Sequence, residues 1–405
     1  MSPFFLQMKQ SIFFLSVFII SCSSNSFQNI NGIKTEDELS LTFKKSVSYL
    51  LPQTFAFNMP FTNVFFDKAT QKEYITFGND YATDSLYFFD LKNGGKPIQV
   101  TPLTNPTRKI KGAFVISLDS ILVVPKNEPS IILLDGAGEI ILSKSFEHLI
   151  QHSFFDLQKN SSIVFNPNLQ KIFFEAEIFA WNIKEKNRFL AMKEYTLNTL
   201  NQPFIFSLSH IFTDSMSSEN YTPNFYSRFV DTNECFFPLP KYYVNDTSLF
   251  ILSAYSDSVY SINHTTGNQV IIPNKITSRH YKPLKSKPAP LVNEDDAYTM
   301  NYLSSRSTSY HLLKFQYYKP LNTYLISISS KALGFNDSGN PNKYSTDRGI
   351  LMYDLNFDKI GEIKLEGKGL FKTYNSGIIL RKTPDKESPS YDPRKIELEF
   401  YELSY

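Results

Sequence analysis

Short apolar runs separated by polar turns recur along most of the chain. The pattern is clearest in SLYFFDLKNGGKPIQV from Ser85, SIILLDGAGEIILSK from Ser130, SVYSINHTTGNQVII from Ser258 and GILMYDLNFDKIGEIKL from Gly349. In each copy the apolar run precedes a turn of Asp, Asn or Gly, and Asn and Gly tolerate the positive φ angles of tight hairpins. The pattern therefore predicts β-hairpins, and helical spacing is scarce.

A further apolar segment often lies upstream of the hairpin and adds a third strand. These segments are EYITFGN from Glu73, SILVVP from Ser120, SLFILSAY from Ser248 and NTYLISISS from Asn322. The hairpins at Ser85 and Ser130 are spaced within the roughly 40–50 residue period of propeller repeats. Because a propeller blade has four strands, this repeat predicts a β-propeller.

Six repeats fit the chain, over residues 55–104, 105–150, 160–212, 222–275, 305–367 and 368–405. The last repeat lacks a strand, and LSLTFKKSV from Leu39 is placed to supply it. Closing the ring in this way removes exposed sheet edges. The predicted fold is an all-β propeller of six blades, with seven as the alternative count. A β-sandwich is the competing architecture, since its short strands have similar turn spacing.

The N-terminal residues have the pattern of an export signal. A start at Met8 gives one basic residue, Lys9, an apolar run from Ile12 to Ile20, and the small residue Ser21 before Cys22. This is the order of regions in a secretory signal peptide. The run is too short for a transmembrane helix, which needs about 20 apolar residues.

The segment Ile19-Ile20-Ser21-Cys22 also resembles a bacterial lipobox. The resemblance implies cleavage before Cys22, lipidation of its thiol with chains such as palmitate, and membrane attachment through them. Because Ser23 and not Asp follows, similarity to Gram-negative lipoproteins implies the outer membrane facing the periplasm, with the cell surface as the alternative. An ordinary cleaved signal with an incidental cysteine is the other interpretation.

Three regions follow from these patterns. We expect residues 1–21 to be a signal peptide, residues 22–38 a flexible polar tether, and residues 39–405 a single propeller domain. The second cysteine, Cys235, is then alone, and we expect it to be a buried strand thiol. A net charge of +2 without a polybasic run argues against a nucleic-acid partner. We expect a monomer.

The chain resembles an uncharacterised family of Bacteroidota lipoproteins with a six-bladed, TolB-like or NHL-like propeller. The stretches that carry this resemblance are FFDKATQKEYITFGNDYATDSLYFFDL, LDSILVVPKNEPSIILLDGAGEII, RGILMYDLNFDKIGEIKL and SPSYDPRKIELEFYEL, and they span most of residues 40–405. The chain departs from the family at TNPTRKIKGAF, where members carry a Gly/Asn-rich turn. Because the family has no assigned activity, the resemblance implies no catalytic residues.

Motifs for catalysis and for metal binding are missing from the sequence. His148 and His152 are spaced as in HExxH, but Leu149 stands where the motif needs Glu. There is no G-x-S-x-G nucleophile elbow and no phosphate loop. The sequence therefore predicts no catalytic residue, no metal and no cofactor.

Two clusters of basic and aromatic residues are the predicted ligand-binding residues. They are Tyr226 and Arg228, in NFYSRF, and Arg279, His280 and Tyr281, in the long Pro-rich segment from Ser278 to Met300; Arg306 is a weaker candidate. Arginine forks and tyrosine hydroxyls recognise carboxylates, phosphates and sugars. The competing interpretation is that these are solvated loop residues.

Three functions agree with these observations. The first is a non-enzymatic, membrane-tethered propeller that binds a peptide, a glycan or an envelope protein. The second is a glycan lyase or hydrolase, for which Glu294, Asp295 and Asp296 are candidate acids, because glycosidases need two facing carboxylates. The third is a purely structural envelope protein without a ligand.

Overall fold

A computed structural model describes the chain over 39–52, 62–78, 85–103, 110–125, 128–149, 156–157, 163–177, 205–221, 234–235, 241–253, 256–278, 287–288, 310–332, 345–365, 368–382, 388–389 and 391–404. Within these ranges, no helix has the length and the apolar composition needed to cross a membrane.

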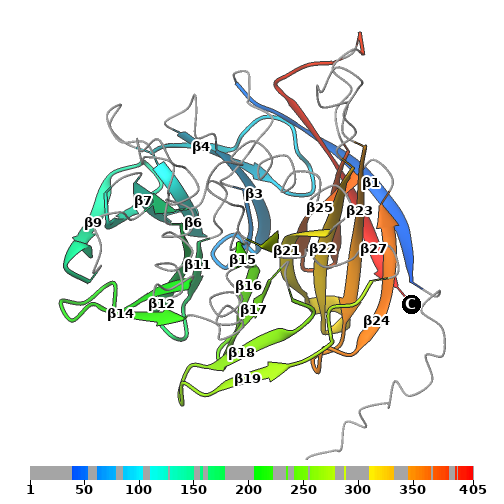
Figure 1. Ribbon diagram of the computed structural model, residues 1–405. Helices are drawn as coiled ribbons and strands as arrows, with labels where there is room; N and C mark the ends of the chain where they lie inside the picture. Colours follow the sequence, from blue (N-terminus) through cyan, green and yellow to red (C-terminus); the bar gives the residue numbers. More distant parts are fainter. Residues whose placement is uncertain are drawn as a thin grey trace, which may run out of the picture. The chain divides into compact units, whose positions relative to one another are not determined.

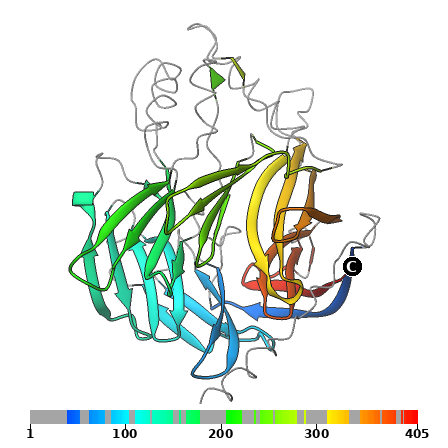
Figure 2. The ribbon, with the colours of Figure 1, turned by 90° about the horizontal axis from the view of Figure 1, so that it is seen from below.

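Six antiparallel sheets form the blades of a propeller (Figures 1 and 2). The first blade comprises β2 (Asn63–Asp67), β3 (Lys72–Gly78), β4 (Ser85–Asp90) and β5 (Gln99–Pro102). The second comprises β6 (Ile110–Ser117), β7 (Ser120–Pro125), β8 (Ser130–Leu134) and β9 (Ile140–Ser145). The third comprises β11 (Val164–Asn166), β12 (Lys171–Glu177), β13 (Ile205–Ser209) and β14 (Ser217–Tyr221), with β10 (Asp156–Leu157) also paired to β12.

The other three blades follow the same order. The fourth comprises β16 (Lys241–Val244), β17 (Ser248–Leu252), β18 (Val259–Asn263) and β19 (Gln269–Ile272). The fifth comprises β21 (Tyr310–Tyr318), β22 (Thr323–Ala332), β23 (Ser345–Tyr353) and β24 (Lys359–Leu365). The sixth comprises β25 (Lys368–Tyr374), β26 (Gly377–Lys382), β27 (Lys395–Ser404) and β1 (Ser40–Leu50). The predicted six-bladed propeller is thus confirmed, and the β-sandwich alternative is wrong.

The first strand of each blade lies nearest the axis of the ring. This follows from contacts between the first strands of different blades: β2 with β6 and with β25, β6 with β11, β16 with β21, and β21 with β25. The later strands of each blade lie progressively farther out, since each pairs with the strand before it. Residues of β21 and β25 are therefore neighbours close to the axis.

The N-terminal strand closes the ring, as the sequence predicts. β1 pairs with β27 along its whole length, from Ser40 opposite Ser404 to Leu50 opposite Lys395. β1 is consequently the outermost strand of the sixth blade, whose other strands come from the C-terminal end of the chain. Ring closure leaves no gap between the first and last repeats, so neither end of the repeat array exposes an open sheet face.

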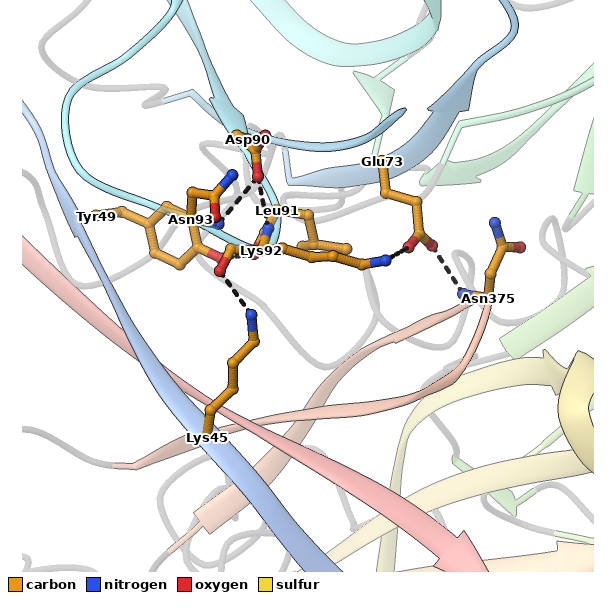
Figure 3. A network of polar contacts seen from close by, with 8 residues as sticks. All are labelled: Lys45, Tyr49, Glu73, Asp90, Leu91, Lys92, Asn93 and Asn375. Carbon is orange, nitrogen blue, oxygen red and sulfur yellow. Dashed lines mark hydrogen bonds and ion pairs between the residues drawn. The ribbon is translucent and has the colours of Figure 1, made fainter. Parts of the chain in front are cut away.

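Hydrogen bonds also join β1 to the first blade (Figure 3). The buried hydroxyl of Tyr49 donates to the carbonyl of Leu91 at 2.6 Å, and Lys45 Nζ donates to the carbonyl of Lys92 at 2.6 Å. The amide of Leu50 donates to the carbonyl of Gly95 at 2.7 Å. Gly95 has a φ of 82°, which glycine adopts at little cost.

Buried apolar residues fill the spaces between blades. One cluster joins β1, the first blade and the sixth blade through Tyr49, Phe77, Phe89, Ile379 and Phe400. Another joins the third, fourth and fifth blades, and in it the ring of Phe250 on the fourth blade lies 5.2 Å, between centroids, from that of Phe357 on the fifth. The high phenylalanine and tyrosine content is thus used in the interblade packing, where aromatic pairs contribute beyond their buried area.

The third blade contains a strand that the sequence pattern did not predict. The polar strand β14 was not expected, because SSENY lacks an apolar pattern, and it pairs along β13 at the outer side of its blade. The apolar segment RFLAMKEYTL, from Arg188, lies outside the described residues. A 3-10 helix, η1 (Glu147–Leu149), follows β9.

A small separate sheet lies beyond the blades. It pairs β15 (Glu234–Cys235) with β20 (Lys287–Pro288). Cys235 is therefore in a strand, as predicted, although its side chain is outside the described part. The remainder of the long segment from Ser278 to Met300 also lies outside the described part, apart from Ser278 itself.

Candidate functional site

The lipidation site and the ligand-binding residues predicted from the sequence all lie outside the described residues. They are Cys22, Tyr226, Arg228, Arg279, His280, Tyr281 and Arg306, and they stay predictions. His148 is exposed on η1, and His152 is outside the described residues. Among the residues that the structure describes, no three His, Cys, Asp or Glu side chains are placed to hold a metal ion.

The described residues bring together four cations that the sequence analysis did not single out. Lys314 lies on β21, Arg348 on β23, Lys372 on β25 and Arg381 on β26. We call these four residues the cation cluster. They belong to the fifth and sixth blades, where β25 contacts both β21 and β23.

A β-bulge precedes each lysine of the cluster. The register of β21 shifts between Leu312 and Lys314, and that of β25 shifts between Leu370 and Lys372. One extra residue, at position 313 or 371, thus comes before the lysine in two adjacent inner strands. Such bulges bend a strand and redirect its side chains, and they are common beside functional sites.

A hydrogen bond from a side chain joins β25 to β21 near the two lysines. The hydroxyl of Thr373, next to Lys372, donates to the carbonyl of Tyr317 on β21 at 3.4 Å. The two bulged strands therefore hold their lysines at equivalent places of neighbouring blades.

The two arginines meet at Gly369. Gly369 lies directly opposite Arg381 in the β25–β26 ladder. The side chain of Arg348 comes from β23 of the neighbouring blade: a Cβ atom at Gly369 would lie 3.1 Å from its Cδ and 3.2 Å from its Cζ, and would collide with Nη1. The absence of a side chain at Gly369 therefore makes room for the Arg348 guanidinium beside Arg381.

Burial lowers the pKa of all four groups, because it disfavours their charged form. All four side chains lie among protein atoms while part of their surface stays accessible. Burial, and then Lys372, Arg381 and Arg348, hold the pKa of Lys314 well below its usual value. Burial lowers the pKa of Lys372 to about 8. Burial together with Arg348 lowers the pKa of Arg381 to about 10, and Tyr391 opposes this effect.

Two of the four cations have no polar partner in the described part of the chain. Arg348 and Lys372 form no hydrogen bond and no ion pair with any residue that the structure describes. Lys359 on β24 is also buried, but its Nζ lies 3.1 Å from Oε2 of Glu362. Charged groups removed from water are normally paired in this way. Arg348 and Lys372 therefore contribute a positive potential that an anion would offset.

A buried hydroxyl lies in the wall of the cluster. Ser327 on β22 is opposite Lys314 in the β21–β22 ladder, and its side chain is 0% exposed. Its Oγ atom has no hydrogen-bond partner in the described ranges. Most buried polar atoms in proteins form a hydrogen bond, so the Oγ atom of Ser327 is an exception.

A weak signal of this cluster exists in the sequence. Lys314 and Lys372 each directly follow two apolar residues, in HLLKF and GLFKT, in two successive repeats. A cation in a strand that packs on neighbouring sheets is unusual, because lysine is rarely buried without a partner. The bulges and the approach of Arg348 to Gly369 are tertiary features that the pattern does not indicate.

No family model and no curated protein matches the sequence. Among solved structures, a member of the duf4221 family from Bacteroides vulgatus matches with a TM-score of 0.66 and 17% identity, over 91% of this chain and 99% of that chain. A protein named for its expected export, from Bacteroides fragilis, matches with a TM-score of 0.43 and 10% identity, over 91% of this chain and 96% of that chain. The first match confirms, at the level of the fold, the resemblance to a Bacteroidota propeller family.

Proposed function

We propose that this chain is an exported, non-enzymatic binding protein, anchored by lipid at Cys22, which binds an anionic group of its partner at the cation cluster. The leader from Met8 to Ser21 and the lipobox-like residues around Cys22 support export and anchoring. The partner is a peptide, a glycan or an envelope protein that carries the anionic group.

One observation supports the binding site above the others. Arg348 and Lys372 are partly buried and have no ion-pair partner among the described residues, while burial lowers the pKa of both. Holding like charges together away from water destabilises the fold, because each cation loses hydration and repels its neighbours. Clusters of perturbed titratable groups are found preferentially at functional sites.

A glycan lyase or hydrolase would use Glu294, Asp295 and Asp296, and these residues lie outside the described part of the chain. The geometry of the cation cluster offers charge and hydrogen-bond donors, which suit binding of an anion.

Anion binding is tested by thermal unfolding of the full-length protein in low salt with acetate, succinate, phosphate or sulfate. We expect at least one anion to raise the Tm, because a ligand that binds only the native state stabilises it. The gain should vanish in the double variant Arg348→Gln/Lys372→Met. It should persist in Lys68→Met, which removes an exposed lysine of the first blade. If no anion raises the Tm, or if the double variant responds like the wild type, the proposed site is wrong.

Anchoring is tested separately by growing cells with labelled palmitate. The wild type should incorporate the label and sediment with outer membranes, whereas Cys22→Ala should remain unlabelled and appear in the soluble exported fraction. An unlabelled wild type would contradict the anchor and leave the anion site unaffected.

A further inference from the structure

The interface between the third and fourth blades contains a histidine with one unsatisfied ring nitrogen. His264 follows β18 in the turn to β19, and its Nε2 atom lies 3.2 Å from the carbonyl oxygen of Asn245. Because a carbonyl oxygen only accepts hydrogen bonds, Nε2 carries the proton of the neutral ring and Nδ1 presents a lone pair. Nδ1 is closed off from solvent and has no hydrogen-bond partner in the described ranges.

The ring of His264 packs across the interface on the third blade. Its centroid lies 5.5 Å from that of Phe173, a buried residue of β12. The hydroxyl of Tyr242, on β16 of the fourth blade, donates to the carbonyl of Phe173 at 3.0 Å. His264 and Tyr242 therefore hold the fourth blade against the same residue of the third.

The face of the third blade that carries Phe173 also carries charged side chains. Phe173 and Glu219 are each directly opposite Ser207 in the sheet, so the three residues share a face. Lys171 and Tyr221 lie two residues along their strands from Phe173 and Glu219, and share this face as well. Nζ of Lys171 lies 2.6 Å from Oε1 of Glu219, and the hydroxyl of Tyr221 donates to Oε2. The histidine thus faces an ammonium group and a carboxylate that already has two donors.

The other carboxylate at this interface is also engaged. Asp246 lies next to Asn245 in the turn between β16 and β17, and its two oxygens accept from Nδ2 of Asn166 at 3.1 Å and of Asn168 at 2.8 Å. The backbone offers little more, because the carbonyl of Ser248 accepts from the Asn245 amide at 3.0 Å. A proton on Nδ1 would therefore meet acceptors that are already in use.

We infer that His264 makes the contact between the third and fourth blades sensitive to acid: when Nδ1 binds a proton, the ring leaves Phe173 and the two blades loosen. The added proton turns a buried lone pair into a buried donor without an acceptor, which is costly. It also places a second positive charge on the side of the interface where Lys171 lies. Because Nδ1 is closed off in the native packing, the charged ring gains hydration only by moving out. This contact is separate from the cation cluster and does not depend on the proposed anion site.

The proton affinity of the ring agrees with this inference. Burial lowers the pKa of His264 from its usual value, and Lys171 lowers it further, while the Asn245 and Ser248 carbonyls and Glu219 oppose this effect. An unfolded histidine has a pKa of about 6.5, so below that pH the unfolded state binds more protons. The free energy of unfolding therefore falls as the pH falls below about 6.5.

The neighbouring carboxylate titrates at lower pH, so the two effects are separable. Burial raises the pKa of Glu219, but the bonds from Lys171 and Tyr221 outweigh burial and hold the pKa below its usual value. Glu219 therefore stays ionised in both states above about pH 5. The range from about pH 5 to about pH 7.5 isolates the histidine.

Urea unfolding of the full-length protein over this pH range is the first test. The variant His264→Gln cannot gain a charge and keeps an N–H donor for the Asn245 carbonyl. We expect the unfolding constant of the wild type, divided by that of His264→Gln, to rise about tenfold between pH 7.5 and pH 5, since one proton allows at most tenfold per pH unit. His148→Gln, which replaces an exposed histidine of η1, should leave the pH profile unchanged. A ratio that stays constant or falls would overturn the inference. His264→Phe keeps an uncharged ring on Phe173 and gives the same comparison if His264→Gln does not fold.

Hydrogen exchange measured by mass spectrometry shows where the acid acts. Wild type and His264→Gln are compared at the same pH, so the intrinsic exchange rates cancel. At pH 5.5 we expect faster exchange in the wild type over β12 and over β16 to β18, and at pH 7.5 no difference. Exchange in β3 and β4 of the first blade should be alike in both proteins. Equal exchange at the interface at pH 5.5, or a difference spread evenly over all six blades, would contradict a local loosening.

Discussion

The guanidinium of Arg348, on the fifth blade, lies against Gly369 of the sixth blade, in the space that a side chain at Gly369 would need. Gly369 in turn faces Arg381 across the β25–β26 ladder. A single glycine thus determines whether two arginines of different sheets can approach one another. This relationship allows the cluster to be altered without removing any charge.

The substitution Gly369→Ala should weaken anion binding and change stability little. Gly369 does not have a positive φ, so the backbone accepts alanine, and only the flexible end of Arg348 has to move. We expect the free energy of unfolding to stay within about 1 kcal/mol of the wild type. The affinity for phosphate should fall about tenfold, because one charged donor is displaced. Calorimetry and urea unfolding measure the two quantities.

A double-mutant cycle provides the control for this prediction. In an Arg348→Ala background, Gly369→Ala should cause no further loss of affinity, because the displaced group is already absent. Additive losses from the two substitutions would show that Gly369→Ala acts by another route.

The substitution Lys372→Met should stabilise the fold while it weakens binding. Lys372 has lost hydration and has no ion-pair partner among the described residues. Methionine keeps most of the aliphatic volume and removes the charge, so we expect a gain of roughly 1 kcal/mol in the free energy of unfolding. The exposed Lys68→Met should change stability by less than about 0.5 kcal/mol. A destabilised Lys372→Met protein would argue that the ammonium group has a structural partner.

Alkaline pH should affect stability and binding in opposite directions. The pKa of Lys372 is about 8 in the native protein and about 10.4 in an unfolded chain. Between these values the unfolded state binds more protons, so the free energy of unfolding increases as the pH rises through this window. Lys314, whose pKa is also lowered, contributes in the same direction.

Anion affinity should decrease over the same pH window, because Lys372 becomes neutral. Urea unfolding and calorimetry between pH 7 and about pH 9.5 avoid the ionisation of unfolded tyrosines near pH 10. Lys372→Met should show a smaller slope in both measurements. A stability that falls steadily over this range would contradict the assigned proton affinities.

The substitution Tyr49→Phe tests ring closure independently of the site. It removes the 2.6 Å hydrogen bond from the buried hydroxyl of Tyr49 to the Leu91 carbonyl. We expect a loss of about 1 kcal/mol in the free energy of unfolding, with phosphate affinity unchanged. An unchanged denaturant slope would show that the ring stays closed in the native state. A variant as stable as the wild type would mean that this bond does not contribute to closure.

The fold could be predicted from local patterns because propeller hairpins are local. The runs at Ser85, Ser130, Ser258 and Gly349 each became the third strand of a blade followed by its outer strand. The closing strand was predicted from the apolar pattern after Leu39 and from the missing strand of the last repeat. The strand β14 was not predictable in this way, because its polar residues are held by pairing with β13.

The cation cluster could not be predicted, because its parts come together only in the folded ring. Lys314 and Arg381 are separated by several strands and become neighbours because β21 and β25 are adjacent near the axis. Bulges depend on how two strands pair, and the residue pattern of one strand does not show them. The basic and aromatic residues that the sequence did indicate, such as Arg228 and Arg279, lie outside the described part of the chain.

The claim that the cation cluster holds an anion is tested by anomalous diffraction from crystals grown with arsenate. Arsenate has the shape and charge of phosphate, and its heavy atom can be located without ambiguity. We predict an anomalous peak between the guanidinium groups of Arg348 and Arg381 that is weaker in crystals of Gly369→Ala grown at the same arsenate concentration. Crystals in which a carboxylate of the chain itself fills that position, with no arsenate bound there, would contradict the claim.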